Sequence, residues 1–289
     1  MVAKNSWRRA CVLFEMSQFS LPHGNRERNE KMRKSPMRKL VCFDSDGTFR
    51  HGKTGEVPES AIRAIKELQS RNIGVVLCTG RHPIELEKMG LLKYGFDGFV
   101  CVNGQLVLDK ELNDISTKTI EGNDKEVLLK LFHSMTDPMI LFERNRLFMN
   151  FHNELVEELK SDPQLYICDV DKYDGAEIFM ATIIRPEEKH IVVSNLEDAP
   201  WHPFAHDIIL PGLGKKYGVE RYMEKEGIEW SNVIAFGDSG NDTEMLEYAG
   251  LGIAMGNAKD EVKRIAKYVT DCVEENGILN ALVKLHIID

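Results

Sequence analysis

Two short acidic segments of the sequence each follow a run of apolar residues. Asp44-Ser45-Asp46-Gly47-Thr48 comes directly after residues 40–43, and Gly237-Asp238-Ser239-Gly240-Asn241-Asp242 comes directly after residues 233–236. Apolar runs of this length are typical of buried strands. In open α/β sheets, ligands bind at the carboxyl ends of the strands. Both segments are therefore candidates for one functional site.

The carboxylates in these segments suggest two kinds of chemistry. Asp44 and Asp46 could divide a group transfer between them, one attacking or binding a metal and the other giving and taking a proton. Asp238 and Asp242 suit a hard cation such as Mg²⁺, which prefers oxygen ligands. A calcium-binding loop is excluded because its required glycine would stand at Phe49. The plainer alternative is a loop that uses Asp and Gly for turn geometry.

A third segment, Thr79-Gly80-Arg81, follows the apolar run of residues 74–78. It offers a hydroxyl group, a flexible backbone N–H and a cation, which are groups that bind phosphate. Thr79 could equally be the N-cap of a helix. The triplet alone therefore leaves both interpretations open.

A fourth segment, Gly212-Leu213-Gly214-Lys215-Lys216, superficially resembles a nucleotide-binding P-loop. That motif would need Gly in place of Ile209 and Ser or Thr in place of Lys216, so it is excluded. One of the two lysines could still give a phosphoryl group a fixed positive charge. Taken alone, two solvated lysines at the start of a helix are the plainer interpretation.

The elements around these segments follow an α/β pattern from Lys39 onward. Ala61, Ala64, Ile65 and Leu68 recur at helical spacing, which predicts one buried face of a helix beginning near Pro58. Alternating strands and helices indicate a parallel sheet covered by helices. Strands are predicted at residues 40–43, 74–78, 99–102, 233–236 and 252–255, and further helices at 216–226, 242–249, 260–266 and 277–285.

The pattern changes between about Leu108 and His206. Strand-like pieces at residues 141–142, 178–184 and 190–193 alternate there with helical segments, including one at 153–160. We therefore expect a separate α+β module that interrupts the α/β domain.

Length and composition fit one large or two modest domains. The chain has 289 residues, and its hydrophobic content of 43% is enough to form a buried core. Six scattered cysteines without a C-x-x-C pair predict reduced thiols in a cytoplasmic protein. The first forty residues hold ten Lys or Arg against three Glu, yet the whole chain has a net charge of −9, so the remainder is strongly acidic. This charge argues against nucleic acid as a partner and suits a divalent cation.

The basic first 37 residues resemble no targeting signal closely. Their apolar stretch at residues 10–14 is too short for a signal peptide, and no later segment approaches transmembrane length. We expect a disordered extension or a mis-assigned upstream start, and no membrane partner, with an organellar transit peptide as the alternative. The sequence does not indicate the oligomeric state.

The four segments, in this order, resemble the motifs of the haloacid dehalogenase superfamily, specifically its Cof-type sugar-phosphatase branch in subfamily IIB. Asn103-Gly104 and Gly256-Asn257-Ala258 match further features of that family. The resemblance runs from about Arg38 to the C-terminus. It implies a Rossmann-like core with a parallel sheet at residues 38–107 and 208–289. It also implies a smaller inserted α+β cap of C2 type at residues 108–207, which excludes water and selects the substrate.

The resemblance also implies roles for individual residues. Asp44 would attack phosphorus and form an aspartyl-phosphate, while Asp46 would protonate the leaving alcohol and then activate water. Mg²⁺ would be held by the Asp44 carboxylate, the Asp46 backbone carbonyl and Asp238. Phosphate would be bound by Thr79, Gly80, Arg81 and Asn241. Lys215, rather than Lys216, would stabilise the charge of the phosphoryl oxygens. Asp242 and Asn241 would orient Lys215 and the water bound to the metal.

The implied activity is magnesium-dependent hydrolysis of small phosphate monoesters. The cap segment lacks a run of basic residues, which favours a sugar phosphate over a polyanion. A phosphomutase on the same scaffold remains open, because retention of an intermediate depends on the cap. An alternative from another class is a non-catalytic phosphate-binding regulatory protein.

Overall fold

The computed structural model describes residues 39–162, 165–186 and 192–289. Its larger sheet has the strand order β13-β12-β11-β1-β2-β3-β4-β5. The strands are β1 (Lys39–Asp44), β2 (Ile73–Cys78), β3 (Gly98–Cys101), β4 (Leu106–Asp109), β5 (Asp114–Thr117), β11 (Val233–Gly237), β12 (Leu251–Ala254) and β13 (Tyr268–Val269). All pairs from β13 to β3 are parallel, whereas β4 pairs antiparallel with both β3 and β5.

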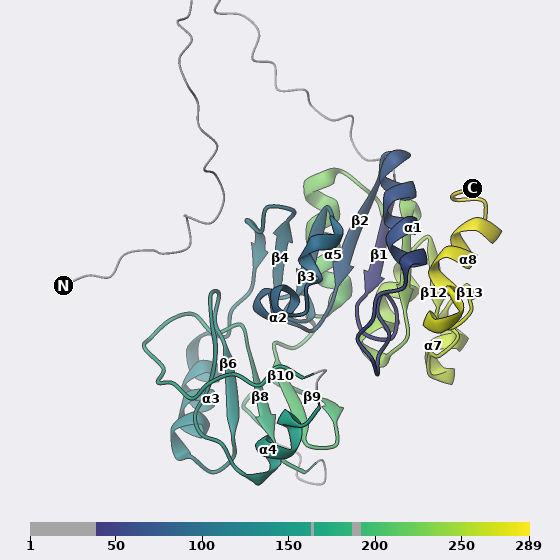
Figure 1. The fold of residues 1–289 in the computed structure, drawn as a ribbon. Helices are drawn as coiled ribbons and strands as arrows, with labels where there is room; N and C mark the ends of the chain where they lie inside the picture. Colours follow the sequence, from purple (N-terminus) through teal and green to yellow (C-terminus); the bar gives the residue numbers. More distant parts are fainter. Residues whose placement is uncertain (1–38, 163–164, 187–191) are drawn as a thin grey trace, which may run out of the picture. The chain divides into compact units, whose positions relative to one another are not determined.

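Helices cover both faces of this sheet. One face carries α1 (Glu59–Ser70), α2 (Pro83–Lys88) and α8 (Gly277–Lys284), and the other carries α5 (Lys215–Glu226), α6 (Thr243–Tyr248) and α7 (Asp260–Ile265) (Figure 1). Successive side chains of a strand point to opposite faces. Val41 and Phe43 of β1 therefore pack on the α1 side, and Leu40 and Cys42 pack on the α5 side. Burial on both faces explains why residues 40–43 of β1 are all apolar.

A second, antiparallel sheet is inserted in the chain between β5 and α5, with the strand order β7-β6-β8-β10-β9. Its elements are α3 (Gly122–Ser134), β6 (Met139–Phe142), β7 (Leu147–Met149), α4 (Glu154–Lys160), β8 (Met180–Ile184), β9 (Glu197–His202) and β10 (Ala205–Ile209). Leu141, Ala181 and Ile208 pack against Leu128 and Phe132 of α3. The fold is thus α/β, with a mostly parallel core sheet and a separate antiparallel insertion, as predicted.

Several predicted boundaries differ from the observed elements. Residues from 108 onward were assigned to the inserted module, but β4 and β5 pair with the core sheet, and β10 extends the smaller sheet to Ile209. β4 has only four residues, and the edge strand β5 lacks an apolar run, so the sequence did not reveal their partners. The helix predicted at 242–249 begins as a 3₁₀ turn at Gly240–Asp242. Residues 1–37, and part of the strand predicted at 190–193, lie outside the described residues.

Two expectations about the protein's environment can be compared with the described residues. Cys42, Cys78, Cys101, Cys168 and Cys272 are free cysteines. Within the described ranges, no helix combines the length and the hydropathy that crossing a membrane requires.

His82 joins the first turn of α2 to the inserted module. Its buried ring places Nε2 2.8 Å from the carbonyl oxygen of Glu143, while Nδ1 accepts a hydrogen bond from the backbone N–H of Ile84 at 3.3 Å. Both contacts fit a neutral ring that is protonated on Nε2. Burial and, more weakly, repulsion by Arg144 lower the pKa of His82 to about 4, although the bond to Glu143 opposes them.

We expect His82 to make the protein less stable in acid. Its pKa in the folded state is about 4 and lies below its ordinary value of 6.5, so unfolding takes up a proton between these two values. The stability is present above pH 6.5 and is lost as the pH falls toward 4, by up to about 3 kcal/mol. The free energy of unfolding, measured over this range, should fall less steeply in His82→Gln than in the wild type. Parallel curves for the two proteins would contradict this expectation.

Candidate active site

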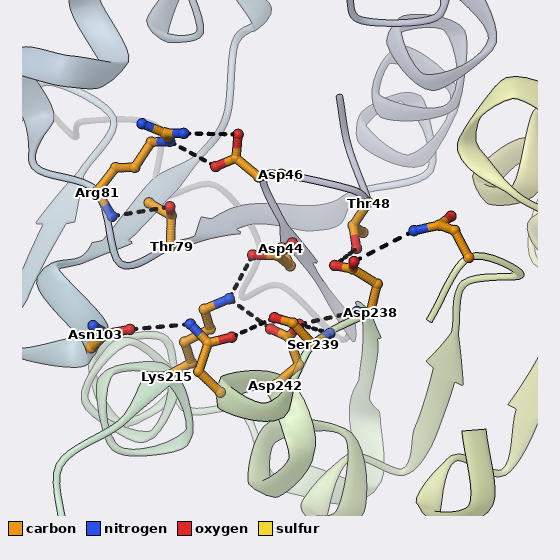
Figure 2. A network of polar contacts seen from close by, with 12 residues as sticks. Asp44, Asp46, Thr48, Thr79, Arg81, Asn103, Lys215, Asp238, Ser239 and Asp242 are labelled. Atoms are coloured by element: carbon orange, nitrogen blue, oxygen red, sulfur yellow. Dashed lines mark hydrogen bonds and ion pairs between the residues drawn. The ribbon is translucent and has the colours of Figure 1, made fainter. Parts of the chain in front are cut away.

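A buried lysine lies between two carboxylates at the carboxyl end of β1. Asp44 is the last residue of β1, and Lys215 is the first of α5. Lys215 Nζ donates to Asp44 Oδ1 at 2.5 Å and to Asp242 Oδ1 at 2.7 Å (Figure 2). Burial opposes the charge of Lys215, but Asp242 and Asp44 outweigh it and raise the lysine pKa, so Lys215 stays protonated. Lys216 instead pairs with Glu220 at 3.3 Å.

Asp242 holds the turn after β11 in place. Its Oδ2 accepts hydrogen bonds from the backbone N–H groups of Asp238 and Ser239, each at 3.0 Å. Gly237 permits this approach, since a Cβ there would lie 2.5 Å from the Cβ of Asp242. Both oxygens of Asp242 are therefore engaged, one by Lys215 and one by the backbone.

Asp238 is positioned by the loop after β1 and by the loop after β12. It accepts hydrogen bonds from Thr48 Oγ1 at 3.2 Å and from Asn257 Nδ2 at 3.4 Å. Asn257 Nδ2 also donates to the carbonyl of Gly47 at 2.8 Å. Gly47 has φ +86°, and a Cβ on it would lie 2.4 Å from Asp238 Oδ2. Glycine is therefore required at position 47, because the positive φ disfavours other residues and because a Cβ would clash with Asp238.

The acidic cluster has the composition of a site for a divalent cation. Carboxylate oxygens of Asp44, Asp238 and Asp242 lie within 4.8 Å of one another. Asp44 Oδ2 is buried and has no hydrogen-bond partner among the described residues. Burial and then repulsion by Asp242 raise the pKa of both Asp44 and Asp238, the latter to about 6. A hard cation would offset this repulsion, with Asp44 and Asp238 as its ligands because Asp242 is already engaged.

Asp46 is bound by arginines. Arg81 donates from Nε to Asp46 Oδ2 at 2.7 Å and from Nη2 to Oδ1 at 3.1 Å (Figure 2). Arg50 Nε lies 3.0 Å from Asp46 Oδ1. Burial by itself raises the pKa of Asp46, but Arg81 and then Arg50 outweigh it and lower the pKa. Asp46 is thus ionised at neutral pH. Arg81, predicted as a phosphate ligand, is engaged by Asp46 and also lies 3.4 Å from Glu85.

The remaining predicted residues lie around these pairs. Thr79 Oγ1 accepts a hydrogen bond from the backbone N–H of Arg81 at 3.1 Å. Thr79 is not a helix N-cap, because His82 has that role for α2. Asn241 Nδ2 donates to Asn103 Oδ1 at 3.3 Å, which links the turn after β11 to the turn after β3.

A cavity of about 250 Å³ brings these groups together. Its lining residues from the core are Asp44, Asp46, Thr79, Gly80, Arg81, Glu85, Asn103, Lys215, Ser239 and Asn241. The inserted module supplies the rest of the lining, including Asp207. Neither Glu85 nor Asp207 was predicted from the sequence. A Glu in a helix and an Asp in a strand match no motif, so only their place in the fold reveals them.

Comparisons with known proteins agree with this geometry. The sequence profile of the haloacid dehalogenase-like hydrolases matches residues 41–282. The chain is similar to the 5-amino-6-(5-phospho-D-ribitylamino)uracil phosphatase YitU of Bacillus subtilis (strain 168), with 45% identity over 267 residues, covering 84% of this chain and 96% of YitU.

Two solved structures share the fold along nearly their whole length. The phosphatase BT1666 from Bacteroides thetaiotaomicron has a TM-score of 0.78 and 27% identity, covering 91% of this chain and 100% of its own. The subclass IIB sugar phosphatase BT4131 has a TM-score of 0.73 and 27% identity, covering 86% of this chain and 100% of its own. Because the profile match spans most of the sequence and residues of all four motifs line one cavity, the chain belongs to the haloacid dehalogenase-like hydrolases, as a phosphatase of the Cof-type subfamily IIB.

Proposed function

We propose that the protein is a magnesium-dependent phosphatase that hydrolyses small phosphate monoesters through an aspartyl-phosphate on Asp44. The strongest support is the state of the Asp44 carboxylate at the cavity wall. Lys215 holds one of its oxygens, while the other is buried without a hydrogen-bond partner among the described residues. An oriented carboxylate with one unengaged oxygen suits a nucleophile.

In the proposed first step, an oxygen of Asp44 forms a bond to phosphorus while the bond from phosphorus to the ester oxygen breaks. The leaving alcohol takes its proton from Asp46. In the second step Asp46 takes a proton from water, and the water oxygen displaces Asp44 from phosphorus. Lys215 and Thr79 would stabilise the phosphoryl oxygens, because both line the same cavity as Asp44.

The contacts of Asp46 add a requirement to this mechanism. A carboxyl group can donate a proton only after it has been protonated, and the ion pairs with Arg81 and Arg50 favour the ionised form. An incoming phosphate ester is a dianion that competes with Asp46 for Arg81. We infer that substrate binding draws Arg81 away, so that the pKa of Asp46 rises when its proton is needed.

The proposed magnesium ligands are the Asp44 carboxylate, the Asp46 backbone carbonyl and Asp238. Their oxygens suit this ion, and the mutual repulsion that raises the pKa of Asp44 and Asp238 favours a bound cation. When bound, the ion would shield the nucleophile from the negative charge of the ester.

Hydrolysis of p-nitrophenyl phosphate provides the test of this function. We expect phosphate release in the presence of Mg²⁺, a fall of at least about a hundredfold after the metal is removed by a chelator, and recovery when Mg²⁺ is added back. If the wild type failed to hydrolyse this ester and a panel of sugar and nucleoside monophosphates with Mg²⁺ present, a phosphate-binding regulatory protein would become the better proposal.

A further inference from the structure

The inserted module gives the cavity a largely apolar wall. Of its fourteen described lining residues, only Thr182 and Asp207 are neither apolar nor aromatic, and none is Lys, Arg or His. The cations of the cavity, Arg81 and Lys215, both come from the core. Within the described residues, this wall thus offers no positive charge to a second phosphate or carboxylate group on the substrate.

Strand alternation explains why one acidic side chain stands in this wall. Ile140, Thr182 and Asp207 are paired neighbours across β6, β8 and β10, so they form one row on the same face of the sheet. Residues one position along each strand, such as Ala181 and Ile208, point to the α3 side instead. The row therefore presents an apolar group, a hydroxyl group and a carboxylate to the cavity.

The two oxygens of Asp207 differ in how well they are satisfied. Oδ1 accepts hydrogen bonds from Thr182 Oγ1 at 2.7 Å and from Trp201 Nε1 at 2.9 Å. Oδ2 accepts only a long hydrogen bond among the described residues, from Asn103 Nδ2 at 3.5 Å. Burial raises the pKa of Asp207 to about 7, so its negative charge is poorly stabilised by these contacts. A further donor reaching Oδ2 would stabilise the charged form.

We propose that Asp207 determines which phosphate esters the protein hydrolyses, a proposal that rests on the phosphatase function above. The alcohol part of the preferred ester carries an uncharged ring, and an N–H group of that ring donates a hydrogen bond to Asp207 Oδ2. Phe142, Tyr166 and Trp201 offer such a ring apolar and aromatic contact. A bare sugar fits this wall poorly, because each hydroxyl group buried there without a partner costs free energy. The proposed substrate differs from the sugar phosphate favoured by the sequence.

Three related esters test the substrate class. Thymidine 5′-monophosphate has a ring with an N–H, its N3-methyl analogue has the ring without that donor, and 2-deoxyribose 5-phosphate lacks the ring. We expect kcat/KM for thymidine 5′-monophosphate to exceed that for each of the other two by at least about tenfold. Equal or faster turnover of 2-deoxyribose 5-phosphate would overturn the inference. If the wild type did not hydrolyse p-nitrophenyl phosphate, the proposed phosphatase function itself would be contradicted.

Asp207→Asn tests the residue. The introduced amide group keeps the size of the side chain but presents a second donor to the N–H of the ring. KM for thymidine 5′-monophosphate should therefore rise at least about tenfold, and the preference for it over the N3-methyl analogue should disappear. Hydrolysis of p-nitrophenyl phosphate, which has no N–H, should change by less than about twofold. Asp169→Asn, an exposed site in the same module, is the matched control. An equal loss on both esters, or an unchanged preference, would overturn the role of Asp207.

Discussion

Replacing Asp44 with Asn should lower kcat for p-nitrophenyl phosphate by at least about a thousandfold, because a neutral amide is a poor nucleophile toward phosphorus. Steady-state phosphate release in the presence of Mg²⁺ measures the loss. Retention of wild-type kcat would rule out Asp44 as the nucleophile.

The Asp44→Asn variant should fold normally, so its loss of activity can be distinguished from a loss of stability. Burial and repulsion by Asp242 raise the pKa of Asp44, so the stability linked to its protonated form is present in acid and is lost as the pH rises through the raised pKa. At neutral pH without metal, removal of this charge should leave the midpoint of thermal unfolding unchanged or higher. A lower midpoint would mean that the loss of activity reflects misfolding.

Replacing Lys215 with Met should damage both activity and stability. The substitution roughly preserves the length of the side chain but leaves Asp44 and Asp242 buried without the cation between them. Removing one partner of a buried ion pair costs about 3–5 kcal/mol, and loss of a charge aimed at the phosphoryl group should lower kcat at least about a hundredfold. Denaturant unfolding and phosphate release measure the two effects.

Lys216→Met is the matched control for this experiment. Lys216 adjoins Lys215 in sequence, yet its ion pair with Glu220 is a partly exposed i,i+4 contact. Pairs of this kind are worth about 0.3–0.5 kcal/mol, so stability and kcat should remain close to those of the wild type. Equal damage from the two substitutions would show that the position of Lys215 between the carboxylates has no special role.

The central strands and the meeting of the four motifs were predictable for a physical reason. Strands buried on both faces, such as β1 and β11, need continuous apolar runs, and the polar residues that end those runs necessarily collect at one edge of a parallel sheet. The helix over 59–70 was equally predictable, because apolar residues from Ala61 to Leu68 recur at helical spacing on one face.

Features that depend on tertiary contacts could not be predicted from the sequence. β4 and β5 are short, and only their pairing with β3 assigns them to the core sheet. The binding of Asp46 by Arg81 joins residues 35 positions apart, and no local pattern specifies it. Asp207 reaches the cavity because of its register opposite Thr182, a relation between strands rather than along one.

The placement of β1 between β2 and β11 has a consequence for biosynthesis. Thr48 and Asp238, which hydrogen-bond in the finished protein, are separated by 190 positions along the chain. In a chain emerging from the ribosome, backbone N–H and C=O groups along one edge of β1 therefore lack their strand partner until β11 is made. Such distant closure slows folding and makes the nascent chain a natural client for chaperones.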